Sequence, residues 1–408
     1  MQTSSRDGVV QLDASFAADP YAFYELLRTE RPVTQAQVLA EPPFWLVTRY
    51  EDVRTGLADP RLVKDTARVV AALRELYGTV PDTGVDLHDH MLNSDPPKHT
   101  RLRKLVTKAF TARAIAGLRP RIEALAVELV EAFAARLAAG EPSVDLIDAV
   151  AFPLPMTVIC EILGIPDDHR GEFREWTHGV LSPTSPQQYT AASAAMRDYL
   201  VGLVADKRAR PGGDILSAVV APDENGDRLS DVEATGMASL LLVAGHETTV
   251  NLIGNGVLTL LRNPGQWERL RAAPALLPDA VDELLRLDSP VNVATIRFTA
   301  EPLTIGGTTI PAGETVLLAI GSANRDPEVF ERPDELDLER PRGAGLAFGH
   351  GIHYCLGAAL ARLEGEIAFR TLLDRLPTLA LAVDPDDLSW QQSLLIRGLE
   401  RLPVRVGR

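Results

Sequence analysis

One stretch of the 408-residue chain points to its fold: Phe348-Gly349-His350-Gly351-Ile352-His353-Tyr354-Cys355-Leu356-Gly357. Glycines at 345, 349, 351 and 357 let this backbone approach a large flat group closely, because glycine has no side chain beyond its Cα. Cys355 comes just before a predicted helix over residues 357–376. The positive dipole end of a helix N-terminus favours the thiolate form of a nearby cysteine, which is the form that binds metal.

Four interpretations of Cys355 are open: a buried free cysteine, a zinc ligand paired with His353, a catalytic nucleophile, and the axial ligand of a haem iron. Zinc needs three or four protein ligands, and the sequence has neither a second cysteine pair nor a His-x-x-x-His pattern. A nucleophile needs an oriented base, which His353 at two residues' separation supplies poorly. A haem iron needs a single cysteine. The other cysteine, Cys160, cannot build a disulfide framework with it.

The longest predicted helix spans residues 231–262. Ser230 and Glu233 form a capping box at its start, and Asn263-Pro264 ends it. Residues 240–244 are apolar on every face, so we expect this helix to run through the core. Within it lie the polar residues of 245–249. Their presence indicates either a functional site or a Thr248 hydroxyl satisfied by the carbonyl of Ala244.

The rest of the chain predicts one large, mainly α-helical domain with small β-sheets. No repeat or linker divides it, so we expect a single domain over residues 1–408, with residues 1–18 as a flexible N-terminal segment. Apolar residues at three- and four-residue spacing predict further helices at 20–29, 100–110, 118–138, 152–163 and 193–207. Strands are predicted at 44–49, 316–319 (after a Gly306-Gly307 hairpin), 379–383 and 404–406.

Composition excludes two classes of protein. With 41 basic and 56 acidic residues the formal net charge is −15, so electrostatic wrapping of nucleic acid is not expected. The longest apolar runs, at 240–244 and 316–320, are far shorter than the roughly 20 residues that a membrane span needs. The first 20 residues lack the basic start and apolar run of a secretory signal, so we expect a cytoplasmic location with no membrane partner.

The pattern Phe348-Gly-x-Gly-x-His-x-Cys355-x-Gly357 resembles the haem-binding loop of the cytochrome P450 monooxygenases. Three further motifs of that family occur in the same order, at 95–103, 244–249 and 283–286, and the resemblance extends from about residue 19 to 406. It is greatest to the bacterial class, and residues 244–256 are most similar to actinobacterial enzymes that hydroxylate macrolides and other polyketides. The implied fold is the cytochrome P450 fold, with haem between the long central helix and the Cys355 loop.

The resemblance implies haem b as cofactor, with Cys355 as its axial thiolate ligand and Phe348 shielding the sulfur. His99 and Arg103, on one helix face, would bind a haem propionate; a solvated surface pair is the alternative. The other positions that match the family's haem contacts are Ala244, Gly245, Arg297, Gly349, His353 and Gly357.

The resemblance also assigns two polar groups. Thr248 and Glu247 would be the catalytic pair that supplies protons for oxygen activation, although the family often has aspartate at the position of Glu247. Glu283, Arg286 and Arg340 would form a buried triad that fixes the loop before Cys355, and a purely structural ion pair is also the family's interpretation of Glu283 and Arg286.

Electrons must come from another protein, because the sequence has no flavin-binding or iron–sulfur pattern. The resemblance implies a ferredoxin and an NAD(P)H-dependent ferredoxin reductase, acting on a monomer. A basic cluster would suit an acidic ferredoxin, with a solvated helix face as the alternative. This cluster consists of Lys98, Arg101, Lys104, Lys108 and Arg113.

The expected reaction inserts one oxygen atom from O2 into a bulky apolar secondary metabolite, a macrolide or another polyketide, by hydroxylation or epoxidation. Alternatives are a terpene, steroid-like or fatty-acid substrate, a haem sensor or carrier, and a helical interaction protein without cofactor. A loop with Asp82, Asp86 and Asp89 is a candidate mobile lid. The predicted pocket residues are Asn93, Leu240, Val243, Val291, Val293, Ala294, Leu394 and Leu395.

Overall fold

The computed structural model describes residues 5–407, apart from residues 7, 39–41, 65, 66, 69, 70, 72–86, 167, 168, 182 and 184. Asp82 and Asp86 of the predicted lid lie outside the described residues. The chain divides into two compact units. The first unit comprises residues 1–62, 119–154 and 248–408, and the second comprises residues 63–118 and 155–247.

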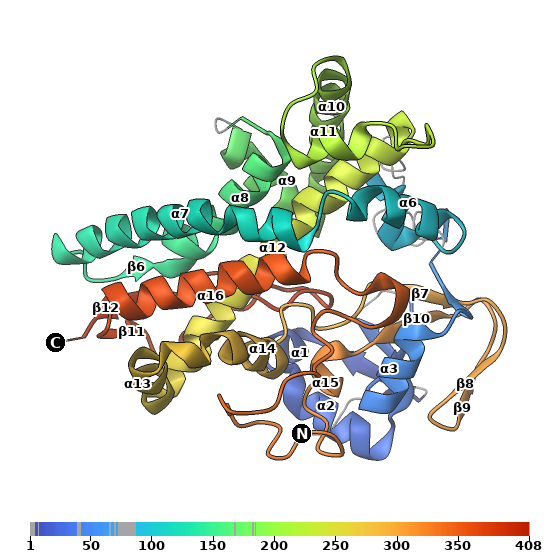
Figure 1. Ribbon diagram of the computed structural model, residues 1–408. Helices are drawn as coiled ribbons and strands as arrows, with labels where there is room; N and C mark the ends of the chain where they lie inside the picture. Colours follow the sequence, from blue (N-terminus) through green and yellow to red (C-terminus); the bar gives the residue numbers. More distant parts are fainter. Residues whose placement is uncertain are drawn as a thin grey trace. The chain divides into compact units, whose positions relative to one another are not determined.

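The first unit contains a seven-stranded sheet in the order β1-β2-β3-β4-β10-β7-β5. Figure 1 labels its strands β7 and β10, near α3. Strands β4 and β10 are parallel, with Trp45 opposite Val316, whereas β3 and β4 are antiparallel. The strands predicted at 44–49 and 316–319 are thus confirmed as β4 and β10. The seven strands are Ser5–Arg6 (β1), Val9–Leu12 (β2), Val33–Val38 (β3), Phe44–Val47 (β4), Leu62–Val63 (β5), Arg297–Thr299 (β7) and Thr315–Leu318 (β10).

This sheet has apolar side chains on both faces, because successive residues of a strand point to opposite sides. Phe44 and Leu46 of β4 join a buried cluster with residues of α1 and α2. Val47 of the same strand joins a second cluster, which includes Val53 and Leu57 of α3. The three helices span Ala14–Ala18 (α1), Pro20–Glu30 (α2) and Tyr50–Ala58 (α3).

The N-terminal segment is part of this packing. Strand β2 pairs in parallel with β3, and the side chains of Val10, Leu12 and Phe16 are buried. Burial of large apolar side chains fixes a segment in the fold, since each contributes roughly 1.5–3 kcal/mol. The expectation that residues 1–18 are flexible is therefore corrected for residues 9–18.

Two small sheets complete the strands of the first unit. Strand β12 (Pro403–Val406) lies between β11 (Leu379–Leu381) and β6 (Val144–Asp145) and is antiparallel to both. Strands were predicted at 404–406 and 379–383, which confirms β12 and β11. Strands β8 (Leu303–Ile305) and β9 (Thr308–Ile310) form the predicted hairpin. Its turn residues, Gly306 and Gly307, have φ angles of 53° and 79°, which glycine adopts without strain.

The remaining helices of the first unit lie after residue 248 and in residues 119–154. Helices α14 and α16 pack against each other, and so do α13 and α16 (Figure 1). These helices are α13 (Pro264–Ala272), α14 (Leu277–Leu287), α15 (Ile320–Ala323) and α16 (Ala358–Arg375), with α7 (Ala112–Ala138) entering the unit at residue 119 and a π-helical turn at Ile147–Ala151.

The second unit is helical. Its helices α9 and α10 pack together, and the rings of Phe173 and Tyr199 meet edge to face with their centroids 5.0 Å apart. Residues 87–93 attach to α10 through His88, whose Nε2 lies 3.0 Å from the hydroxyl of Tyr189. The helices are α6 (Lys98–Thr107), α9 (Arg170–Leu181), α10 (Pro186–Ala209) and α11 (Ile215–Val220), together with most of α8 (Pro153–Leu163) and a 3₁₀ turn at Met91–Asn93.

Helix α12 (Asp231–Arg262) has the predicted bounds and belongs to both units. Its residues up to Glu247 belong to the second unit, and its residues from Thr248 onward belong to the first unit. Its predicted capping box is confirmed. The amide of Ser230 donates to Glu233 over 2.9 Å, and the amide of Glu233 donates to the Ser230 hydroxyl over 3.1 Å. Among the described residues, no helix has the length and apolarity needed to cross a membrane.

Candidate active site

The Cys355 loop consists of consecutive tight turns and ends just before helix α16. Gly349 and Gly351 have φ angles of 73° and 75°, and the amide of Cys355 donates to the carbonyl of Phe348 over 2.9 Å. The thiol of Cys355 is exposed, whereas Cys160 is fully buried. Helix α16 begins at Ala358, one residue later than predicted, so Cys355 lies just outside its N-terminus, where a thiolate is stabilised.

Glycine at position 351 is required by a neighbouring helix. A Cβ atom there would lie 3.1 Å from the Cα of Ala58, at the end of α3, and its φ angle is positive. A larger residue would push the loop off α3 and strain the backbone. The glycine pattern that the sequence analysis associated with a flat ligand therefore also serves the packing of this loop on α3.

Phe348 is held by an arginine from α16. The guanidinium of Arg362 lies over the Phe348 ring, 4.4 Å from its centroid, and donates to Asp282 of α14 over 2.7 Å. The centroids of Phe348 and Tyr354 are 6.4 Å apart. These contacts fix the aromatic side chain that lies, in the chain, seven residues before the thiol.

The structure brings the three residues of the predicted triad together. Arg286 donates from Nε to Glu283 over 2.7 Å, and Arg340 donates from Nε to the same carboxylate over 3.1 Å. Glu283 and Arg286 are 4% and 3% exposed. Arg286 also donates to the carbonyls of Asn324 and Pro333, so the triad fixes the irregular chain that leads to the Cys355 loop.

The apolar residues predicted to line a substrate pocket in the first unit are neighbours. Val291 and Ile396 form a β-bridge, and the amide of Asn292 donates to the carbonyl of Leu395 over 2.9 Å. Val293 and Ala294 are buried, whereas Val291, Leu394 and Leu395 remain partly accessible. Arg297 on β7 is 4% exposed, and its Nη1 donates to the carbonyl of Leu62 over 3.4 Å.

In α12 the predicted site residues share one side of the helix. Leu240, Val243, Ala244, Glu247 and Thr248 are all partly or fully accessible, and their spacing of three, four, seven and eight residues places them in one stripe. Leu241 and Leu242 are buried, as expected for a helix that runs through the core, and the accessible face of α12 is the one with the candidate catalytic residues.

The other face of α12 is buried and explains Gly245. A Cβ atom at Gly245 would lie 2.7 Å from Cδ1 of Ile159, so glycine allows α8 to pack closely against α12. His246 is fully buried and Thr249 is 2% exposed. Gly245, predicted as a haem contact, therefore has a packing role between two helices of the second unit.

On α6, His99 is 3% exposed and Arg103 is partly accessible. Burial lowers the pKa of His99, and the charges of Arg103 and Lys64 lower it further, so the neutral imidazole is favoured. Asn93, another predicted pocket residue, is 8% exposed and donates from its side chain to the carbonyl of His88 over 3.3 Å.

Most of the predicted basic cluster is paired with acidic residues. Lys98 pairs with Asp89, Lys108 with Asp223 at 3.4 Å, and Arg101 with Asp227 and Glu233. Asp89, expected in a lid, is thus tied to the start of α6. These ion pairs reduce the positive charge that α6 presents to a partner. The sequence did not indicate the pairs of Arg101 and Lys108, because their acidic partners lie more than 100 residues away in the chain.

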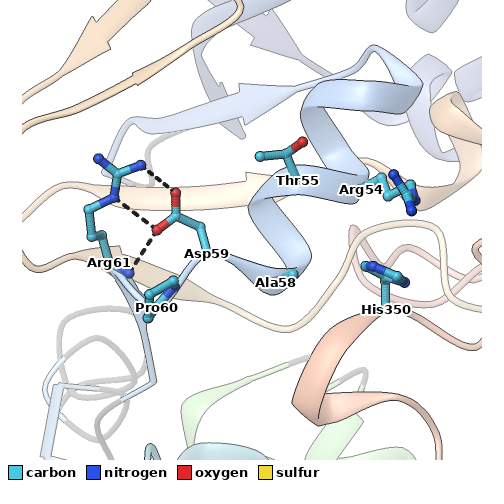
Figure 2. A pocket seen from close by; sticks show the side chains of 7 residues that line it. All are labelled: Arg54, Thr55, Ala58, Asp59, Pro60, Arg61 and His350. Atoms are coloured by element: carbon cyan, nitrogen blue, oxygen red, sulfur yellow. Dashed lines mark hydrogen bonds and ion pairs between the residues drawn. The ribbon is translucent and has the colours of Figure 1, made fainter.

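A cavity whose lining includes two arginines, one histidine and one aspartate lies beside the Cys355 loop and was not predicted. Its volume is about 520 Å³, and Figure 2 shows that His350 comes from this loop while the other residues come from α3 and the turn after it. Arg61 forms a bidentate ion pair with Asp59. Nη1 of Arg54 lies 3.7 Å from Oε2 of Glu51 at the surface. The lining residues are Arg54, Thr55, Ala58, Asp59, Pro60, Arg61 and His350.

A buried carboxyl group close to α12 was also missed. Glu364 on α16 is 1% exposed, and burial raises its pKa to about 8, with the nearby Thr249 hydroxyl acting in the opposite direction. Its signal was present in the sequence, since Glu364 interrupts the apolar stripe formed by Leu360, Leu363 and Ile367.

An exposed cysteine at the end of a glycine-containing loop, just before a helix, agrees with the resemblance of the sequence to the cytochrome P450 monooxygenases. The chain belongs to the cytochrome P450 family, whose model, described as Cytochrome P450, matches residues 189–397. It is 50% identical over 410 residues to Cytochrome P450 107B1 of Saccharopolyspora erythraea, with all of both chains covered. It is 42% identical to 6-deoxyerythronolide B hydroxylase of the same organism, covering 96% of this chain and 97% of the relative.

A solved structure agrees with this assignment. The P450 monooxygenase TamI, bound to tirandamycin C, is 48% identical and superposes with a TM-score of 0.88, over 97% of this chain and all of that chain. The predictions of a P450 fold and of a P450 monooxygenase are thereby confirmed.

Proposed function

We propose that this chain binds haem b through the thiolate of Cys355 and inserts one oxygen atom from O2 into a bulky apolar polyketide of the macrolide type. The observation that carries the proposal is the exposed Cys355 thiol at the end of a glycine-fixed loop, just before α16. A thiol in that position is available as thiolate to an iron, whereas Cys160 is enclosed by the core.

The chemistry of the donor set fits haem. Haem brings two carboxylates, and a buried guanidinium or imidazole is the kind of group that balances them. Arg297 and His99 are each at least 96% buried, and Arg103 follows His99 by four residues on α6. We assign these three, with His353, to the propionates and Phe348 to the shielding of the sulfur.

When bound, haem supplies the electron-transfer and oxygen-activating chemistry. The residues of this chain then deliver protons. Glu247, whose side chain is 17% exposed, is placed to take protons from solvent, and the Thr248 hydroxyl is next to it on the same stripe of α12. A carboxyl and a hydroxyl in sequence can pass a proton into a site that is otherwise apolar.

The substrate assignment rests on the apolar wall and on the relatives. Val291, Leu394 and Leu395, the partly accessible members of this wall, form a surface suited to a large apolar molecule. One relative is named for hydroxylating 6-deoxyerythronolide B, and another was solved with tirandamycin C. Spectral titration with macrolides, linear polyketides, terpenes, steroids and fatty acids tests it: tightest binding of a macrolide supports the assignment, and tightest binding of any other class refutes it.

The haem assignment has a direct test with a matched control. The reduced, carbon monoxide-treated wild-type protein should show the Soret band of a thiolate-ligated haem. Cys355→Ala should lose that band, and Cys160→Ala should keep it. A thiolate-type band in the Cys355 variant would overturn the assignment. Substrate oxidation by the wild-type protein with a redox partner separates an enzyme from a haem sensor or carrier.

For the electron donor we propose a ferredoxin, reduced by an NAD(P)H-dependent reductase, with the chain acting as a monomeric single-domain enzyme. The ion pairs of α6 leave Lys104 and Arg113 as exposed cations of the predicted basic cluster. Arg54 and His350 line the cavity beside the Cys355 loop, and a carboxylate of an acidic ferredoxin suits that cavity.

A further inference from the structure

The apolar wall proposed for the substrate is carried by two chain segments, residues 290–293 and 394–397, which meet as a short antiparallel β-pairing. Val291 and Ile396 form a bridge, and the amide of Asn292 donates to the carbonyl of Leu395 over 2.9 Å. A pairing of so few residues is not stable without further support. The position of the wall therefore depends on the groups that hold the two segments together.

One end of this pairing is held by an ion pair. Nε of Arg397 donates to Oδ1 of Asp288 over 2.6 Å, and both residues are buried. The amide of Arg397 donates to the carbonyl of Pro290 over 2.8 Å. In an antiparallel pairing this end lies away from Leu394 and Leu395, so another group must fix the end with the accessible leucines.

The side chain of Asn292 fixes that other end. Asn292 is 3% exposed, and its Nδ2 donates to the carbonyl of Leu394 over 3.3 Å. Its Oδ1 accepts a hydrogen bond from the hydroxyl of Tyr24 on α2 over 3.0 Å. A carbonyl only accepts hydrogen bonds, so the amide cannot turn over without losing its bond to Leu394. One side chain thus links the leucine segment to a helix of the core.

The surroundings of Asn292 allow it little movement. Tyr24 is fully buried, and its ring meets Phe16 edge to face with the centroids 5.4 Å apart. Burial raises the pKa of the Tyr24 hydroxyl, so it stays a hydrogen-bond donor. The amide of Gly321 on α15 donates to the main-chain carbonyl of Asn292 over 2.9 Å, and a Cβ atom at Gly321 would lie 2.7 Å from Oδ1 of Asn292. Asn292 is therefore held by both its main chain and its side chain.

We infer that Asn292 is a positioning residue for substrate selection: its amide, held by Tyr24, sets the place of Leu394 and Leu395 relative to Val291. The inference rests on the proposed function, which assigns this wall to the substrate. Asn292 acts through its neighbours and does not touch the substrate, because it is buried with its side chain directed at Tyr24.

Hydrogen exchange of the haem-loaded protein tests the positioning without a substrate. Asn292→Leu is close in size and removes both side-chain hydrogen bonds, whereas Tyr24→Phe removes one of them. Exchange at the amides of residues 292 and 397 should become about tenfold faster in Asn292→Leu and several-fold faster in Tyr24→Phe. Tyr50→Phe is the matched control, because its hydroxyl donates to the carbonyl of Ala344 over 2.7 Å. Unchanged rates in the first two variants, or an equal rise in the control, refute the inference.

Spectral titration tests the effect on substrate selection. The probes are 6-deoxyerythronolide B, for which one relative is named, and imidazole, a small ligand of haem iron. Asn292→Leu should weaken binding of the macrolide about tenfold and Tyr24→Phe about threefold, because the wall is displaced from its bound geometry. Binding of imidazole should stay at the wild-type value.

This comparison separates positioning from a general loss of structure. Equal weakening of both probes, or an unchanged affinity for the macrolide, refutes the inference. No binding of the macrolide to the wild type would count against the proposed substrate, and the exchange rates would then decide the role of Asn292.

Discussion

At the scale of single residues, we expect that removal of the Thr248 hydroxyl changes the products of turnover and leaves the fold intact. We expect Thr248→Ala to keep its haem and its carbon monoxide spectrum. Product per NAD(P)H should fall several-fold and hydrogen peroxide should rise, because the proposed proton path along α12 loses the hydroxyl of Thr248. Quantifying product and peroxide from the same reaction measures this.

Thr259 on the same helix provides the control, since its side chain is also partly accessible and lies about three turns away. Thr259→Ala should couple electrons to product as the wild type does. Equal uncoupling in both variants would contradict the assignment of Thr248.

Glu364 should give the stability of the protein a pH dependence. Burial raises its pKa to about 8, above its usual value of 4.5. Between these values the unfolded chain loses the proton and the folded chain keeps it, so stability falls as pH rises, by up to about 1.4 kcal/mol per pH unit, and levels off above pH 8. Glu364→Gln lacks this penalty, so its Tm relative to the wild type should rise from pH 5 to pH 8.

Glu400→Gln, a change of an exposed carboxylate, should show no such trend. A difference in Tm between Glu364→Gln and wild type that stays constant over this range would mean that Glu364 is ionised in the folded protein.

The triad makes the third prediction at this scale. Arg340→Ala leaves the buried carboxylate of Glu283 with one of its two arginines, and breaking a buried charge network costs about 3–5 kcal/mol. We expect poor haem retention, measured as the ratio of Soret to protein absorbance. Arg332→Ala removes a nearby exposed guanidinium and should retain haem; equal haem content in the two variants would show that the triad does not fix the Cys355 loop.

At the scale of elements, the N-terminus of α12 depends on its capping box. Ser230→Ala removes the acceptor for the amide of Glu233, so we expect the free energy of unfolding to fall by about 0.5–2 kcal/mol. Ser230→Gly should cost only a few tenths, because glycine is tolerated at the cap position. Chemical denaturation of both variants measures the difference, and equal losses would argue against a capping role.

The sequence predicted the elements that have strong local signals. Helix α12 has its predicted bounds because a capping box and an Asn-Pro pair mark its ends, and the Gly306-Gly307 turn marked the hairpin. Helices α3 and α9 were missed, because each has few apolar residues among many charged ones, so no three- and four-residue spacing of apolar residues can be recognised. Helix α10 begins at Pro186 rather than 193, since Ser185 caps it by accepting from the amide of Gln188.

The candidate site was predictable to a different extent at each position. The Cys355 motif and the triad could be recognised from the spacing of their residues in the sequence. In the structure Arg286 and Arg340 both donate to Glu283, as expected. The ion pairs of Arg101 were not predictable, because its partners lie 126 and 132 residues away in the chain. The accessible stripe of α12 was not predictable either, because an all-apolar run does not show which of its faces is covered.

At the scale of the whole molecule, a net charge of −15 makes any acidic partner dependent on local positive charge. We expect Arg54→Glu to slow reduction of the haem by an acidic ferredoxin about tenfold at low ionic strength, with a smaller effect at high salt. Reduction by dithionite should be unchanged. Stopped-flow spectroscopy at several salt concentrations measures both rates.

Arg405→Glu changes the same charge on the exposed strand β12 and is the matched control. If both variants slow the ferredoxin reaction equally, the net charge and not the cavity beside the Cys355 loop governs docking.

The pairing of β2 with β3 has a practical consequence for shortened versions of this protein. Removing residues 1–18 would take away β1 and β2, which together cover one edge of the seven-stranded sheet. Strand β3 would then expose unpaired amide and carbonyl groups at Ala36, Gln37 and Val38, the three residues that pair with β2. Open strand edges recruit other chains, so such a truncated protein should aggregate at concentrations at which the full chain does not.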